Sequence, residues 1–100
     1  MPREQERITY LIETVLECAS GKREARISDL SPGGCYIDSI VSVQEGEPVS
    51  FSLKDPSGRT LPFTGQVAYV FDGAGFGVKF TELTDERKAF LDEVIRAHSG

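Results

Sequence analysis

The sequence predicts a mainly β protein, built as a small six-stranded antiparallel β-barrel and completed by one C-terminal α-helix. In several short segments apolar residues alternate with polar ones, which is the pattern of a strand with one buried face. Clusters of Gly, Pro, Ser and Asp separate these segments at intervals of about 8 to 12 residues, a spacing typical of small all-β folds. Only the final segment changes to helical spacing, so we expect a single helix to cover one opening of the barrel.

Length and charge limit what the chain can be. One hundred residues, 39% of them hydrophobic, are enough for one domain with a small core. The net charge of −5 argues against DNA or RNA as a partner, because nucleic acids are usually bound by a basic surface. A small anion is still compatible with this charge, because two or three arginines can form a local positive site.

The cysteines and the hydropathy pattern indicate a cytoplasmic protein. Cys18 and Cys35 are too few for a disulfide scaffold and lie in strand-like sequence, so we expect reduced thiols. Together with the lone His98 they also offer too few ligands for a metal site. The sequence shows no signal peptide, and no apolar run is long enough to span a membrane.

The N-terminal half contains three predicted strands, over residues 8–18, 23–28 and 35–38. In the first strand the apolar positions follow a period of two, at Ile8, Tyr10, Ile12 and Leu16. The second strand returns antiparallel to the first after a Gly-containing turn. An exposed edge at the short third strand would allow two copies to pair, so a monomer and a homodimer both stay open.

The C-terminal half contains three more predicted strands and the helix, over residues 49–53, 60–71, 76–80 and 85–98. In the longest strand, alternation places four side chains on one face: Leu61, Phe63, Val67 and Tyr69. Tyr69 is therefore predicted to lie in the core, as is Phe76 in the last strand. Thr84 suits the N-cap of the helix, which is expected to bury Phe90, Leu91, Val94 and Ile95.

The stretch from Asp29 to Gly34, with the sequence DLSPGG, is the one best suited to a ligand. Its Asp, Ser, Pro and Gly residues predict a tight polar connection between two strands, and a plain hairpin turn is the alternative reading. As ligand groups, the Asp29 carboxylate can accept hydrogen bonds from N1–H and N2–H₂ of guanine, and Ser31 can donate to a phosphate or a base edge. Gly34 leaves room for a close backbone approach.

A second polar element, Arg3-Glu4-Gln5-Glu6-Arg7, stands at the start of the chain. Arginine binds phosphate oxygens and the O6/N7 edge of guanine through two parallel hydrogen bonds, and its flat face stacks on bases. Arg3 and Arg7 can face one ligand together, from a helical turn or from an extended arm. The alternative is a solvated charge cluster that Glu4 and Glu6 partly neutralise. Both elements together suit a ligand that contains guanines and phosphates.

These two elements, in this order, resemble the RxxxR and [D/N]xSxxG motifs of PilZ domains, which are bacterial receptors for cyclic di-GMP. The stretches GQVAYV, from Gly65, and GFGVKF, from Gly75, resemble the last strands of that family. The resemblance implies a PilZ-like split barrel over residues 8–98, preceded by a flexible arm at residues 1–8 that folds over the ligand.

The resemblance also implies roles for individual residues. Arg3 and Arg7 would hold phosphates and stack on or hydrogen-bond to guanine, and Asp29, Ser31 and Gly34 would meet the other side of the dinucleotide. The second strand carries two candidates for additional ligand contacts, Arg23 and Arg26, for which a solvated strand face is the alternative.

The expected function is that of a receptor without enzymatic activity and without a cofactor beyond cyclic di-GMP itself. No nucleophile–base pair or paired carboxylate in the sequence suggests catalysis. Ligand binding is expected to change the conformation of the arm, and the new surface would signal to a protein partner. The alternative is a PilZ-like interaction module that binds no nucleotide, and the five motif residues argue for the receptor. One or two bound ligands both stay open.

Overall fold

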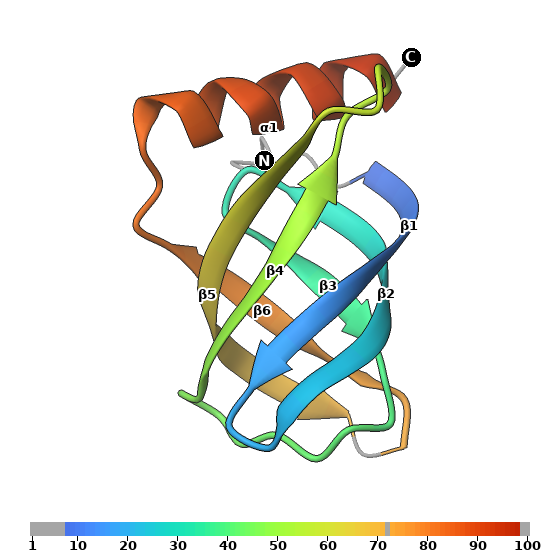
Figure 1. Cartoon of the computed structure of the whole chain (residues 1–100), viewed down its shortest axis with the longest axis vertical. Helices are drawn as coiled ribbons and strands as arrows, with labels where there is room; N and C mark the ends of the chain where they lie inside the picture. Colours follow the sequence, from blue (N-terminus) through green and yellow to red (C-terminus); the bar gives the residue numbers. More distant parts are fainter. Residues whose placement is uncertain (1–7, 72, 99–100) are drawn as a thin grey trace, which may run out of the picture.

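The computed structural model describes residues 8–71 and 73–98 and shows a six-stranded antiparallel barrel with one helix (Figure 1). The elements are β1 (Ile8–Cys18), β2 (Gly21–Ser31), β3 (Gly34–Asp38), β4 (Pro48–Lys54), β5 (Thr60–Phe71), β6 (Gly75–Thr81) and α1 (Asp85–His98). The barrel closes in the order β1-β2-β3-β6-β5-β4. The predicted fold class is therefore confirmed.

The strands agree closely with their predicted spans, and β2 differs most. It runs from Gly21 to Ser31 instead of covering residues 23–28, so Asp29 and Ser31 belong to the strand and not to a loop. The predicted open edge at residues 35–38 is wrong, because β3 is paired with β2 on one side and with β6 on the other. Barrel closure leaves that strand with no edge to offer a second copy.

Helix α1 lies across one end of the barrel and closes it (Figure 1). Its predicted apolar stripe is buried, at Phe90, Leu91, Val94 and Ile95. The Phe90 ring contacts the ring of Phe63 in β5, with centroids 5.8 Å apart. Thr84 caps the helix as expected, since its hydroxyl accepts a hydrogen bond of 3.2 Å from the Arg87 amide. Within the described residues, no helix has the length and hydropathy needed to cross a lipid bilayer.

A β-bulge in β5 overturns one prediction about the core. The pairing with β6 passes from Val67 opposite Val78 directly to Tyr69 opposite Gly77, so Ala68 is the extra residue. Strict alternation would turn Tyr69 inward with Phe63 and Val67. The bulge turns it outward, where the residue is 39% exposed. Phe76, the other aromatic residue predicted to lie in the core, is buried.

The seam between β1 and β4 closes the barrel with little main-chain ladder pairing. One residue pair, Glu17 with Ser50, lies in ladder register there. Farther along, the Thr14 hydroxyl donates to the Ser52 carbonyl at 2.9 Å and accepts from the Ser52 amide at 3.2 Å. The Tyr10 hydroxyl likewise accepts from the Lys54 amide at 2.8 Å and donates to the Lys54 carbonyl. Side-chain hydroxyls thus replace a strand ladder along this seam.

Tyr10→Phe is expected to lower the free energy of unfolding by about 1–3 kcal/mol, because it leaves the Lys54 amide and carbonyl without this partner. Burial raises the pKa of Tyr10, so the hydroxyl keeps its proton to higher pH in the folded chain than in the unfolded one. From about pH 10, the unfolded state begins to lose this proton while the native state keeps it. The free energy of unfolding therefore falls as pH rises from there through the raised pKa. Denaturant unfolding between pH 7 and 11 tests both points. Equal midpoints for the native chain and the variant would contradict them.

Candidate functional site

The site predicted from the sequence forms at the turn between β2 and β3. Asp29 and Ser31 end β2, Pro32 and Gly33 make the turn, and Gly34 begins β3. The Ser31 side chain is buried, and its hydroxyl donates to the Gly34 carbonyl at 3.2 Å. The Gly33 carbonyl accepts from the Phe80 amide of β6 at 2.9 Å. These bonds hold the turn in one conformation, so Ser31 acts first as a structural part of it.

Gly34 is required by close packing of two strands and not by an unusual backbone angle. A Cβ atom added at this position would lie 2.1 Å from the carbonyl oxygen of Val78 in β6. That oxygen is main chain and cannot rotate away from a larger side chain. The close approach at Gly34 is therefore to the neighbouring strand, and an approach to a ligand stays a prediction.

Asp29 lies in a row of residues that crosses the outer surface of the barrel. Ladder partners connect Thr9 to Asp29, Asp29 to Tyr36, Tyr36 to Gly77, and Gly77 to Tyr69. The row therefore crosses five strands, β1, β2, β3, β6 and β5 in turn. Asp29 and Tyr36 are partly exposed, so a carboxylate and an aromatic ring stand next to each other on the surface.

Three aromatic rings form a cluster along this part of the surface. The Tyr36 and Tyr69 rings are nearly parallel, with centroids 6.3 Å apart and an interplanar angle of 29°. The Phe71 ring contacts both, at 6.2 Å from Tyr36 and 5.3 Å from Tyr69. Burial, and then the nearby Asp38 carboxylate, raises the pKa of Tyr36, so its hydroxyl stays neutral and can donate a hydrogen bond. Strand alternation in the sequence did not predict this cluster, because it turned Tyr69 toward the core.

A shallow pocket connects the turn to the aromatic cluster. The turn contributes Ser31, Gly33 and Gly34 to its lining, and the other side includes Tyr69 and Lys79. Lys79 is exposed and is the ladder partner of Gly34, so one positive charge stands directly beside the turn. The pocket therefore combines backbone, an aromatic ring and a cation.

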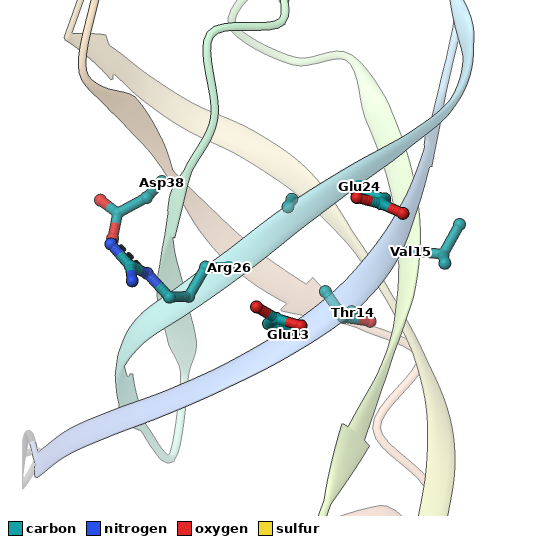
Figure 2. Close-up of a pocket in the computed structure, with 7 residues that line it drawn as sticks. Glu13, Thr14, Val15, Glu24, Arg26 and Asp38 are labelled. Atoms are coloured by element: carbon teal, nitrogen blue, oxygen red, sulfur yellow. Dashed lines mark ion pairs between the residues drawn. The ribbon is translucent and has the colours of Figure 1, made fainter.

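The two additional arginine candidates lie farther along β2. Figure 2 shows Arg26 in an outer pocket, where its Nε is 3.8 Å from Oδ2 of Asp38. Glu13 and Glu24 also line this pocket, so its lining carries three carboxylates and one guanidinium and disfavours a phosphate there. Arg23 is eight residues from Ser31 in the same strand, or about 26 Å at the usual rise per residue. The structure thus brings neither arginine to the turn.

Arg3 and Arg7, with the rest of residues 1–7, lie outside the described residues. Within the described part of the chain, no group of three or more His, Cys, Asp or Glu side chains is arranged to hold a metal ion. Cys18 and Cys35 are both unbridged, and Cys35 is buried.

A family model described as "PilZ domain" matches residues 2–97. The chain belongs to the PilZ domain family. The match includes both motifs found in the sequence, and it covers the whole barrel and nearly all of α1. PilZ domains are binding domains and not a family of enzymes. Among curated protein sequences, none matches this chain.

Three solved structures share the fold at low sequence identity. The PilZ domain of YcgR from Escherichia coli, solved with c-di-GMP, is 18% identical, with a TM-score of 0.78 over 99% of this chain and 92% of that one. The PilZ domain of CeSA from a cellulose-synthesizing bacterium is 18% identical, with a TM-score of 0.70 over 92% and 96%. The Bacillus subtilis inhibitor of motility, MotI/DgrA, is 18% identical, with a TM-score of 0.79 over 97% of this chain and 51% of its own length.

Proposed function

We propose that this PilZ domain is a receptor for cyclic di-GMP, with Arg3, Arg7, Asp29, Ser31 and Gly34 as its binding residues. Two independent facts support the proposal. The chain carries both motifs in the family order, and the similar PilZ domain of YcgR was solved with c-di-GMP. The five residues supply the groups that a ligand with two guanines and two phosphates requires.

The register of β1 on β2 is the observation that carries this proposal. Ile8 is the ladder partner of Leu30, the residue between Asp29 and Ser31. Arg7 is bonded directly to Ile8, and consecutive Cα atoms are about 3.8 Å apart. This register supports Arg7 as a binding residue, because the first described residue after it is paired inside the second motif.

Charge gives the two motifs separate tasks. Around the turn, the pocket linings include two lysines, Lys79 and Lys88, and the Asp92 carboxylate, and Asp29 adds a second carboxylate. These charges balance, so they leave no surplus of positive charge for two phosphates. Arg3 and Arg7 would supply that surplus, while Asp29 accepts hydrogen bonds from N1–H and N2–H₂ of a guanine. Ser31 and Gly34 would hold the turn in the shape that the ligand meets.

Binding is expected to order the arm over the ligand up to residue 7, since Ile8 already belongs to β1. Ordering a residue costs about 1 kcal/mol or more, and a hydrogen bond to a charged group contributes about 1.5–3 kcal/mol. Several such bonds are needed, so each arginine should be important. The ordered arm would form a new surface that a protein partner reads. The competing function is a barrel that binds a protein partner and no nucleotide.

Isothermal titration of the purified protein with cyclic di-GMP, cyclic di-AMP and GMP tests the proposal. We expect saturable binding of cyclic di-GMP only. Cyclic di-AMP lacks the N1–H and N2–H₂ donors that pair with Asp29, and GMP supplies one guanine and one phosphate to a site that contacts two of each. The stoichiometry distinguishes one ligand from two. If no heat is released and the melting temperature does not change, the protein-interaction function is correct instead.

Arg7→Ala is expected to weaken cyclic di-GMP binding at least about tenfold, since it removes at least one hydrogen bond between a guanidinium and a phosphate or guanine. Lys22→Ala is the matched control. Lys22 lies at the opposite end of β2 from Ser31. Its side chain is exposed, and its Nζ is 3.9 Å from Oε2 of Glu17. The control should bind like the native chain. Unchanged affinity of the Arg7 variant would exclude an arm that clamps the ligand.

A further inference from the structure

The outer surface beside the turn carries aromatic rings that the core does not use. The bulge at Ala68 turns Tyr69 outward, and the neighbouring Phe71 is 58% exposed. Together with Tyr36 they form the aromatic cluster described above, on strands β3 and β5. Exposed rings that gather in one place on a small barrel usually mark a binding surface.

Two glycines of β6 determine how these rings lie. Gly77 stands between Tyr36 and Tyr69 in the row across the barrel. A Cβ atom added at Gly77 would lie 2.3 Å from Cζ of Tyr69, and one at Gly75 would lie 3.0 Å from the Tyr36 hydroxyl oxygen. The rings therefore rest on the β6 backbone where side chains are missing. The Tyr69 ring rests on the strand beside the Tyr36 and Phe71 rings, and 39% of the residue stays exposed, where a planar group can reach it.

We propose that Tyr36 and Tyr69 form a stacking surface for one guanine base of the dinucleotide. This inference rests on the proposed function and adds two residues to its site. Both rings share the row of Asp29, and Tyr69 lines the same pocket as the turn residues Ser31 and Gly34. A guanine that lies on the rings can direct its N1–H and N2–H₂ edge along the row toward Asp29. Lys79, beside Gly34, stands where a phosphate would follow.

The chemistry of the two contacts is complementary. Stacking on an aromatic ring holds any base by its face, so it strengthens binding without selecting guanine. The Asp29 carboxylate reads the edge, so it selects guanine. A protein partner would be expected to need a larger apolar area than one ring pair, and the carboxylate and lysine that border the rings suit a small polar ligand better.

The test compares cyclic di-GMP titrations of the native chain, Tyr69→Leu and Tyr69→Phe, with Ile40→Ala as a control. Ile40 is an apolar residue that is 92% exposed and lies after β3, away from the turn. We expect Tyr69→Leu to weaken binding at least about fivefold, as the loss of one stacked base does. Tyr69→Phe keeps the ring and should bind within about twofold of the native chain. The control should bind like the native chain.

Tyrosine fluorescence gives a readout that a merely structural role would not change. The chain contains three tyrosines and no tryptophan, and Tyr10 is buried at the seam. Stacking of guanine should therefore quench emission from Tyr36 and Tyr69, and this quenching should be strongly reduced in Tyr69→Leu. The melting temperature of the variant without ligand shows whether the fold is intact.

Each outcome decides between the two proposals. Normal affinity and quenching in Tyr69→Leu would overturn the stacking surface and leave the receptor function standing. Equal losses in Tyr69→Leu and Tyr69→Phe would overturn it as well, because the hydroxyl and not the ring would then make the contact. A native chain that binds no cyclic di-GMP would overturn the receptor function and the stacking surface with it.

Discussion

Replacing Phe63 by alanine is expected to lower the free energy of unfolding by about 3–5 kcal/mol, the usual cost of removing a fully buried phenylalanine ring. Phe63 has no exposed surface, and its ring lies 5.3 Å from the Phe80 ring and 5.8 Å from the Phe90 ring. It therefore connects β5, β6 and α1 in one contact group. A domain of this size is typically stable by about 5–15 kcal/mol, so the variant would be only marginally folded.

Chemical denaturation followed by circular dichroism measures this loss, and Phe71→Ala is the matched control. Phe71 is the same residue type in the same strand, but it is mostly exposed. We expect its replacement to cost less than about 1.5 kcal/mol, because little buried area and no internal cavity are involved. Similar losses in the two variants would show that the contact between the helix and the barrel end contributes little to stability.

Gly34→Ala should destabilise the protein by about 3 kcal/mol and also abolish tight cyclic di-GMP binding. The added methyl group would lie 2.1 Å from the Val78 carbonyl oxygen, so β3 and β6 must separate at the turn. Extra atoms in a packed region commonly cost about 1–3 kcal/mol, and a main-chain obstacle belongs at the upper end of that range. The same displacement would break the bond from the Ser31 hydroxyl to the Gly34 carbonyl.

Gly77→Ala provides the comparison in the neighbouring strand. There the obstructing atoms belong to the ring of Tyr69, which is exposed and can rotate away from the new methyl group. We expect a loss of stability below about 1.5 kcal/mol for this variant. Thermal melts and titrations of both variants separate the effects. Gly34→Ala that melts and binds like the native chain would refute the close packing of the two strands at the turn.

Most of the fold could be predicted because each strand has one buried face. In β4, for example, Val49, Phe51 and Leu53 alternate with polar residues, and their burial follows that pattern. The prediction was wrong at Tyr69, because one extra residue in β5 shifts the alternation and no local signal marks Ala68 as that residue. It was too short at β2, because Asp29 and Ser31 favour turns in isolation. Pairing holds them in the strand, Asp29 between Thr9 and Tyr36, and Ser31 opposite Gly34.

The candidate site was predicted in part. The motif correctly pointed to a tight turn, and the close contact of Gly34 proved to be with β6. The neighbours of Asp29 could not be predicted, since Tyr36, Gly77 and Tyr69 come together only through the register of β3, β6 and β5. The alternating glycines of Gly75-Phe76-Gly77 were the available signal, because they leave an uncovered strip of backbone on which large rings can rest.

The hydroxyl-bridged seam between β1 and β4 gives the barrel a preferred place to open. Local opening there breaks one ladder pair and the bonds of two side-chain hydroxyls, while the ladders between the other neighbouring strands stay intact. The molecule would then be a curved sheet with β1 and β4 as its two edges. Amide hydrogens of Ser52 and Lys54 should therefore exchange with solvent through small fluctuations, long before those of β3 and β6, which require the whole domain to unfold.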